Sequence, residues 1–164
     1  MKAVMYILII LSVSVGGCSR KADVDELSQH FEQHRAQFDA LADAACSYYA
    51  SFPRGFDIFE VDAPVVYLEH HAQYAAQMNS LLKEINESRI ILHRSGNTEC
   101  SLFLRQWAVV DAEGSSHMGY SYHPSKLSEY NPAIHQKDNR NTRENIYFTK
   151  ALADGWYIEY VNIP

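Results

Sequence analysis

The residues of this chain that invite a metal-site interpretation are its eight histidines among 164 residues. His30 and His34 are four residues apart, a spacing at which a helix presents two imidazoles to one zinc ion. The intervening residues, Phe31-Glu32-Gln33, do not give the His-Glu-x-x-His pattern of zinc peptidases. A structural zinc site needs about four ligands, and this pair supplies two. His34 also lies on an apolar helical stripe, so packing accounts for its position. We therefore expect no metal and no cofactor, with a surface site built from several histidine clusters as the alternative.

One pair of residues has the spacing of a nucleophile and its base. Ser80 and Lys83 fit the Ser-x-x-Lys pattern of penicillin-binding enzymes, yet no Lys-Thr-Gly sequence follows them. The sequence also contains no Gly-x-Ser-x-Gly turn, no P-loop and no glycine-rich dinucleotide turn. Ser80 and Lys83 are also the polar residues expected on the solvent-facing side of a helix. The sequence therefore favours a protein that is not an enzyme.

The first 18 residues have the pattern of an export signal. Lys2 precedes a nearly all-apolar run of 13 residues, 3–15. Thirteen helical residues span only about 20 Å, less than the ~30 Å hydrocarbon core of a bilayer. A signal peptide therefore explains the run better than a membrane-spanning helix.

The apolar run ends in Val15-Gly16-Gly17-Cys18, which resembles the bacterial lipobox. The resemblance implies that residues 1–17 are a lipoprotein signal peptide, and that Cys18 receives a diacylglycerol on sulfur and a fatty acid such as palmitate on its new amine. Ser19 resembles the residue at this position in lipoproteins of the outer membrane, facing the periplasm. Residues 18–22 then form a lipidated tether, and residues 23–164 a single domain. An uncleaved anchor or a signal cut elsewhere is the alternative.

The charge balance excludes some partners. The chain has 14 basic and 20 acidic residues, for a formal charge of −6 at pH 7. Removal of the signal deletes Lys2 and leaves 13 basic against 20 acidic residues, or −7. A nucleic-acid binder needs a basic face for the phosphates, so we expect no nucleic-acid partner.

Cys46 and Cys100 are the cysteines that remain once Cys18 is lipidated. The periplasm is oxidising, so two leftover thiols are expected to form one disulfide. That bond would connect the helical part of the chain to its strands. The alternative is two buried thiols that lie too far apart to join.

Hydrophobic periodicity predicts an α+β fold. Apolar residues at spacings of three and four predict one long helix over about residues 23–50 and a second from Pro64 to about Glu87. Segment 56–61 is either a short strand or an irregular crossing, and 124–141 is expected to be a long mobile loop. Alternating and β-rich segments predict strands at 90–92, 100–111, 117–123, 143–149 and 156–161. The predicted architecture is an N-terminal helical hairpin packed on a small antiparallel sheet of about four to five strands.

Two motifs in the last third of the chain, 119–124 and 155–160, read Gly-Tyr-Ser-Tyr-His-Pro and Gly-Trp-Tyr-Ile-Glu-Tyr. They resemble small uncharacterised bacterial proteins in which a Gly-Tyr-x-Tyr strand pairs with a terminal Trp-Tyr-x-x-Tyr strand behind two helices. The resemblance implies a fold and no activity.

Aromatic side chains provide the candidate binding residues. Tyrosine and tryptophan offer large rigid surfaces that stack on sugars or anchor protein partners. Trp156, Ile158 and Tyr160 share one strand face and are expected in the core, whereas Tyr157 has the opposite parity. The candidate binding residues are Tyr120, Tyr122 and Tyr157, with Tyr157 the strongest.

These features predict a non-catalytic envelope lipoprotein, held at the membrane by its N-terminal lipid. It would act as a tethered interaction or structural module with a protein partner. The alternative is a periplasmic immunity or inhibitor lipoprotein that blocks a toxin or a hydrolase, because acidic charge would steer a basic partner.

Replacement of the lipobox cysteine tests the anchor. In Cys18→Ala no thiol accepts the diacylglycerol, so we expect an unlipidated precursor that retains residues 1–17 and leaves the membrane fraction. Mass spectrometry of the purified protein and fractionation of the envelope measure both effects. Cys100→Ser, which removes a different cysteine, should keep the lipid. Identical masses and fractionation for parent and Cys18→Ala would contradict the lipoprotein assignment.

Overall fold

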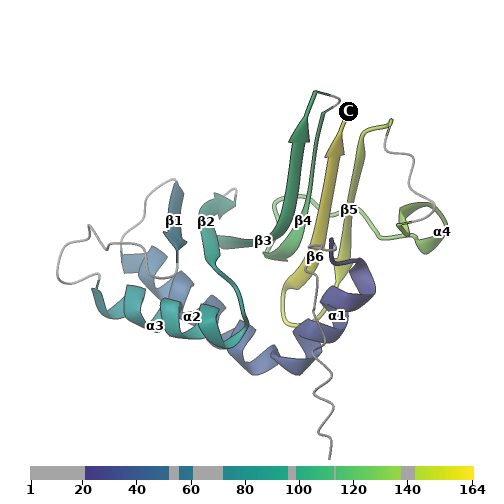
Figure 1. Ribbon diagram of the computed structural model, residues 1–164. Coiled ribbons are helices and arrows are strands. Elements are labelled where there is room, and N and C mark those ends of the chain that lie inside the picture. The colour runs from purple at the N-terminus through teal and green to yellow at the C-terminus, as the bar shows by residue number, and fades with distance from the viewer. Residues whose placement is uncertain (1–20, 52–55, 61–71, 96–98, 113, 138–142) are drawn as a thin grey trace, which may run out of the picture.

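A computed structural model describes residues 21–51, 56–60, 72–95, 99–112, 114–137 and 143–164 (Figure 1). Within these residues the chain forms helices followed by an antiparallel sheet, so the α+β class predicted from the sequence is confirmed. In chain order the elements are α1 (Val24–Gln33), α2 (Arg35–Ser51), β1 (Phe56–Glu60), α3 (Ala72–Glu84), β2 (Arg89–Ser95), β3 (Glu99–Asp111), β4 (Gly114–Tyr122), α4 (Pro132–His135), β5 (Ile146–Ala151) and β6 (Trp156–Ile163).

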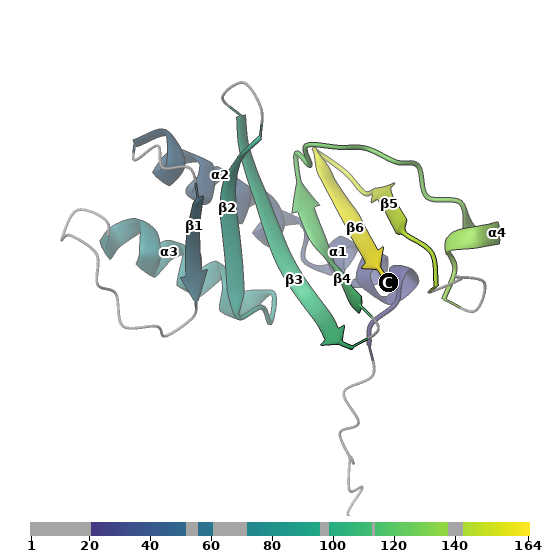
Figure 2. The same cartoon turned by 90° about the horizontal axis from the view of Figure 1, so that it is seen from above.

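The sheet has six strands in the order β1-β2-β3-β4-β6-β5, and each strand pairs antiparallel with its neighbours. β6 lies between β4 and β5 and therefore interrupts an otherwise sequential meander. Helices α1, α2 and α3 all lie on one face of this sheet (Figures 1 and 2). The sheet has one strand more than the predicted four to five, because residues 56–60 pair with β2 over their whole length.

The first helix begins with a capping box. The Asp23 carboxylate accepts hydrogen bonds from the backbone N–H groups of Asp25 and Glu26, and the Glu26 carboxylate accepts from the Asp23 N–H at 3.0 Å. This reciprocal pair satisfies N–H groups that have no partner within the helix. The cap therefore fixes where α1 begins.

The single helix predicted over residues 23–50 is wrong, because the structure has two helices separated at His34. His34 has non-helical dihedral angles, φ −122° and ψ 20°, and its N–H bonds back to the carbonyls of His30 and Phe31. The break lets each helix pack separately: α1 contacts β6, and α2 contacts α3 and β3. Both helices keep their apolar stripes buried on the same core.

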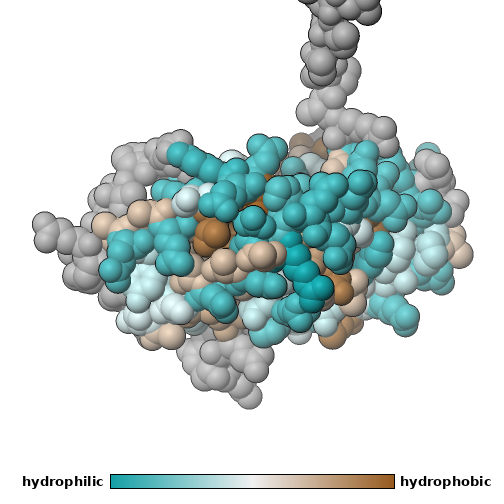
Figure 3. Space-filling model, turned by 90° about the horizontal axis from the view of Figure 1, so that it is seen from below, coloured by the Kyte–Doolittle hydropathy of each residue, from teal (hydrophilic) through white to brown (hydrophobic). Residues whose placement is uncertain are grey.

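The predicted helical hairpin consists of α2 and α3, which lie side by side (Figure 1). Tyr48 of α2 and Tyr74 of α3 form an edge contact with ring centroids 5.9 Å apart. The predicted start of the second helix at Pro64 lies outside the described residues. The outward surface of the helices is mainly hydrophilic, as expected for a layer that faces solvent (Figure 3). Of the helices described, none is long and apolar enough to span a membrane.

Aromatic side chains fill the core between the helices and the sheet. Phe38 at the start of α2 contacts Tyr120 and Trp156, with ring centroids 4.7 Å and 5.2 Å apart. Trp156, Ile158 and Tyr160 are buried, which confirms the core face predicted for β6. Burial of one such side chain contributes about 1.5–3 kcal/mol relative to exposure.

The two glycine-containing motifs lie on neighbouring strands. Tyr120 of β4 is paired with Ile158 of β6, and Tyr122 with Trp156. A Cβ atom at Gly119 would lie 2.1 Å from the carbonyl oxygen of Leu104 on β3, so only glycine permits this strand approach. The motif therefore marks a site of close backbone packing.

The segment predicted to be a long mobile loop is described up to residue 137, and this part is bound to β5. The Thr149 N–H donates to the Ser128 carbonyl at 2.6 Å, and the Tyr130 N–H donates to the Thr149 carbonyl at 3.2 Å. Glu129 forms a parallel bridge with Thr149. The segment therefore covers part of an edge strand that would otherwise expose its backbone groups.

Cys46 of α2 and Cys100 of β3 form a disulfide, with Cα atoms 5.5 Å apart, as predicted from the sequence. The bond links residues 54 positions apart in the chain. It ties the hairpin of α2 and α3 to the middle of the sheet.

Removal of this bond should destabilise the domain. The double variant Cys46→Ser, Cys100→Ser is expected to lose roughly 4 kcal/mol of unfolding free energy, because closure of a loop of this length restricts the unfolded chain. Urea denaturation monitored by circular dichroism measures the difference. A reductant should bring the parent to the stability of the variant. Equal stability of parent and variant under oxidising conditions would contradict the bond.

Candidate functional site

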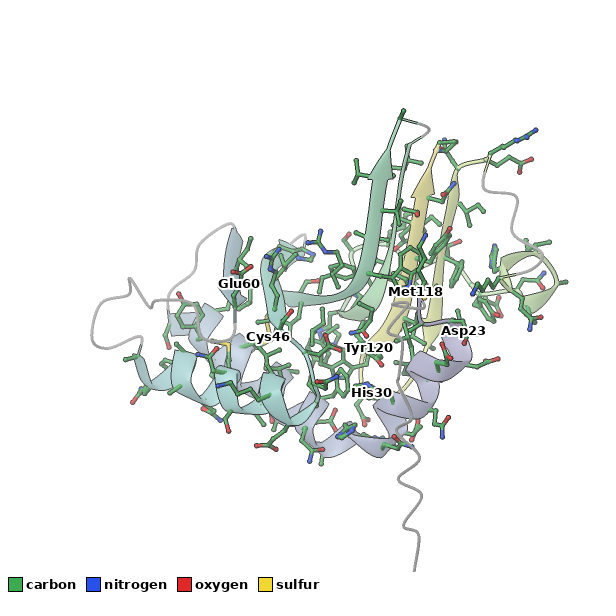
Figure 4. All side chains as sticks on the ribbon, in the orientation of Figure 1. Asp23, His30, Cys46, Glu60, Met118 and Tyr120 are labelled. Carbon is green, nitrogen blue, oxygen red and sulfur yellow. A yellow bond between two sulfur atoms is a disulfide. The ribbon has the colours of Figure 1, made fainter. Side chains whose placement is uncertain are left out.

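Tyr120, one of the three candidate binding tyrosines, is fully buried and faces the helices. Its hydroxyl donates to the Leu27 carbonyl at 3.0 Å and lies 2.9 Å from Nδ1 of His30 (Figure 4). Because a tyrosine hydroxyl has one hydrogen and Leu27 receives it, His30 Nδ1 must donate in the second bond. Tyr120 is therefore a connector between α1 and β4 and offers no surface to a large partner.

Tyr122 is half-buried and stacks on His123, with ring centroids 4.0 Å apart. Burial, together with the carboxylates of Asp43, Asp39 and Asp154, raises the pKa of its phenol. Tyr122 shares the inner face of the sheet with Trp156, with ring centroids 5.1 Å apart. The structure does not bring Tyr122 together with Tyr157, because Tyr157 has the opposite strand parity.

Tyr157 lies at a surface pocket of about 340 Å³ between the end of β5 and the segment after β4. The pocket is lined by Leu127, Glu129, Tyr130, Thr149, Lys150, Ala151 and Tyr157. Leu127 is 60 % exposed and offers apolar surface at this pocket. Of the three predicted tyrosines, Tyr157 is the one that the structure places at an accessible pocket.

Hydrogen bonds hold the walls of the Tyr157 pocket in place. The Ser128 N–H donates to Thr149 Oγ1 at 3.0 Å, and the Tyr147 hydroxyl donates to the Lys126 carbonyl at 2.6 Å. On the helix side, Lys150 Nζ donates to Ser28 Oγ at 2.9 Å and lies 5.7 Å from the centre of the Tyr130 ring. The pocket is therefore preformed and does not require a loop to become ordered.

A second pocket, of about 250 Å³, lies between α1, the turn that follows α3 and strand β3. It is lined by Ala22, Glu26, Leu27, His30, Ile85, Asn86, Glu87 and Gln106. The sequence analysis did not identify this site. We call it the Glu87 pocket.

The end of α3 positions Glu87. Asn86 adopts a left-handed conformation with φ 56°, which asparagine tolerates better than most residues. The Glu87 N–H then bonds back to the Leu82 carbonyl at 2.8 Å, closing the helix end. Burial raises the pKa of the Glu87 carboxyl to about 7, although a hydrogen bond from Gln106 acts in the opposite direction.

A β-bulge brings Gln106 to the same pocket. The register of β3 against β4 shifts between Arg105 and Trp107, which leaves Gln106 as the extra residue. Bulges redirect a side chain that would otherwise follow the strand alternation. Here the Gln106 side-chain amide donates to Oε1 of Glu87.

His30 completes the polar cluster from the side of α1. Burial, followed by the nearby charge of His34, lowers the pKa of the His30 imidazole, and a hydrogen bond with the backbone of Ile85 opposes this change. Burial, followed by the charge of Glu87, raises the pKa of Tyr120. These four polar side chains come from four separate segments, so no local motif could have revealed the cluster.

The histidine pair considered as a zinc site is close together in space. The ring centroids of His30 and His34 are 4.8 Å apart. However, Nδ1 of His30 is hydrogen-bonded to Tyr120. In the part of the chain that the structure describes, no group of three or more histidine, cysteine, aspartate or glutamate residues is placed to hold a metal ion.

No protein-family model matches this chain, and no significant match is found among curated proteins or solved structures. The structure shows an α+β domain with two surface pockets, one beside Tyr157 and one beside Glu87. Functional inference therefore rests on the chemistry of these pockets and on the sequence.

Loss of the Tyr120 hydroxyl should destabilise the domain. In Tyr120→Phe the Leu27 carbonyl and the His30 N–H both lose a partner, and unsatisfied buried groups cost about 1–3 kcal/mol. Urea denaturation measures the effect. Tyr157→Phe removes the same atom from an accessible tyrosine and should change stability by less than about 0.5 kcal/mol. Equal effects of the two substitutions would contradict the connector role of Tyr120.

Proposed function

We propose that this protein is a non-catalytic envelope lipoprotein, a membrane-tethered module that binds a protein partner through the Tyr157 pocket. The observation that carries the proposal is this preformed pocket, with Tyr157 and the exposed Leu127 at its surface. Tyrosine supplies a large contact area with few rotatable bonds, which is why it is common among residues that dominate binding energy. A preformed pocket avoids the entropy loss of ordering a loop on binding.

The compartment is supported by two independent features of the sequence. The lipobox-like segment at 15–18 supports a lipid on Cys18, and Ser19 supports the outer membrane, facing the periplasm. The Cys46–Cys100 disulfide suits an oxidising compartment. About five residues connect Cys18 to the helix cap at Asp23, a reach of at most roughly 17 Å. The partner therefore lies at the membrane or extends toward it.

The chemistry of the Tyr157 pocket favours an apolar or aromatic side chain of the partner as the inserted group. Leu127, Tyr130 and Ala151 provide apolar area, and Glu129 and Lys150 provide polar groups of opposite charge at the same pocket. Apolar area next to polar groups is typical of protein–protein contacts.

The second candidate function is an immunity or inhibitor lipoprotein directed at a basic toxin or hydrolase. The specific observation in its favour is the acidic outer side of α2. Burial and the neighbouring carboxylates of Asp154 and Asp43 raise the pKa of Asp39, although Arg35, which is paired with Asp154, lowers it. A basic partner would relieve this repulsion and associate faster at low salt.

Retention of a partner from envelope extracts distinguishes the two functions. The bait is the full-length lipidated protein, compared with Tyr157→Ala and with Asp39→Asn, Asp43→Asn. We expect Tyr157→Ala to weaken binding about thirty-fold, because truncation of a central aromatic residue costs about 2 kcal/mol or more. Surface plasmon resonance with the identified partner measures the change.

The acidic-face variant is the matched control for this experiment. It should bind the partner with nearly unchanged affinity if the Tyr157 pocket is the contact. The reverse pattern, in which loss of the two carboxylates abolishes binding and Tyr157→Ala does not, would support the immunity or inhibitor function. Unchanged retention of the partner by both variants would contradict both.

A further inference from the structure

Asn86, Glu87 and Ser88 lie in the turn that connects α3 to β2 and have the sequence Asn-x-Ser. An asparagine followed two positions later by serine or threonine, with any residue except proline between them, is the acceptor pattern of N-linked glycosylation in exported proteins. No other asparagine of this chain has serine or threonine at that position. The pattern therefore marks a single place in the chain for attachment of a glycan.

The turn exposes the two side chains that define this acceptor. Asn86 and Ser88 are exposed, whereas Ile85 and Ile90 on either side of them are fully buried. Asn86 has φ 56°, so the chain leaves the helix at this residue and does not continue the buried stripe of α3. The folded domain therefore presents the acceptor at its surface, where a glycan can be attached and accommodated.

The turn is held by its backbone and not by the acceptor side chains. In the part of the chain that the structure describes, no residue forms a hydrogen bond with the side-chain amide of Asn86 or with the hydroxyl of Ser88. The Asn86 N–H donates to the Lys83 carbonyl at 3.1 Å. The Glu87 N–H donates to the Leu82 carbonyl at 2.8 Å. Substitution of the Asn86 amide nitrogen therefore breaks no hydrogen bond that holds the turn.

Asn86 lies near the end of the domain that carries the lipid tether. Asn86 and Ala22 both line the Glu87 pocket. Ala22 follows Cys18 by four residues, a reach of at most roughly 14 Å. A transferase that takes its oligosaccharide from a lipid carrier acts at the membrane surface, so tethering raises the local concentration of this acceptor. This proximity rests on the proposed attachment of Cys18 to the membrane.

We propose that Asn86 is a glycosylation site, which receives an oligosaccharide from a polyprenyl diphosphate carrier once the chain has been exported. A bond forms between Nδ2 of Asn86 and C1 of the first sugar, and the bond between C1 and the diphosphate oxygen breaks. The diphosphate leaves on its carrier lipid with the bonding electrons, and Nδ2 gives up one proton. The hydroxyl of Ser88 is the group by which the transferase recognises the acceptor.

A glycan on Asn86 leaves the Tyr157 pocket accessible. That pocket lies between the end of β5 and the segment after β4, whereas Asn86 lies between α3 and β2. In the sheet, β2 is separated from β5 by β3, β4 and β6. Glycosylation and binding of the partner therefore use different parts of the surface and can be tested separately.

Mass spectrometry of the full-length protein, purified from the envelope of the cells that naturally produce it, tests the proposal. We expect the proteolytic peptide that contains Asn86 to carry the added mass of an oligosaccharide, and the peptide that contains Cys18 to carry the lipid. A lipidated Cys18 peptide together with a wholly unmodified Asn86 peptide would refute the glycan and leave the lipoprotein assignment intact. Retention of residues 1–17, with neither site modified, would overturn both proposals.

Variants produced in the same cells identify the acceptor. Asn86→Asp keeps a residue that tolerates positive φ and removes the amide, so the glycan should be lost. Ser88→Ala leaves Asn86 in place and removes the hydroxyl, and it should also lose the glycan, whereas Ser88→Thr restores a hydroxyl and should keep it. Asn145→Gln removes an exposed asparagine outside the pattern and should keep the glycan. A glycan retained by Ser88→Ala, or lost in Asn145→Gln, would refute the site.

Discussion

The phenol of Tyr120 fixes how the first helix sits on the sheet. Its ring packs against Phe38 at the start of α2, and its hydroxyl bonds to the backbone of α1 through Leu27. One side chain thus contacts both segments on either side of the helix break. Because the phenol also accepts a hydrogen bond from His30, it orients the imidazole that lines the Glu87 pocket. The geometry of the pocket is therefore a consequence of core packing.

The sequence predicted features that depend on local periodicity, and the disulfide, for which two cysteines remain once Cys18 is assigned to the lipid. The parity of Trp156, Ile158 and Tyr160 predicted the core face of β6, because strand side chains alternate strictly. The Cys46–Cys100 bond was predicted from two remaining thiols and from the expectation of an oxidising compartment. Both predictions needed no knowledge of how distant elements meet.

Predictions from the sequence were wrong, or could not be made, for features that depend on packing between distant segments. The apolar stripe continues through Phe31, His34 and Phe38 at helical spacing, so periodicity cannot show that the helix stops at His34. The bulge at Gln106 has no sequence signature, because it arises from strand pairing. Glu87 appeared as an ordinary polar residue at a helix end. Its significance comes from contacts with Gln106 and Tyr120, which lie 19 and 33 positions further along the chain.

The position of β6 between β4 and β5 has a consequence for how the chain acquires its structure. β6 is the last strand in the sequence, yet it contributes Trp156 and Tyr160 to the core and supplies the pairing partner of both neighbouring strands. Before β6 pairs, no strand connects β4 and β5 in the sheet. The aromatic cluster around Phe38 then also lacks Trp156. Pairing of this last strand therefore completes the sheet and the aromatic core in one step.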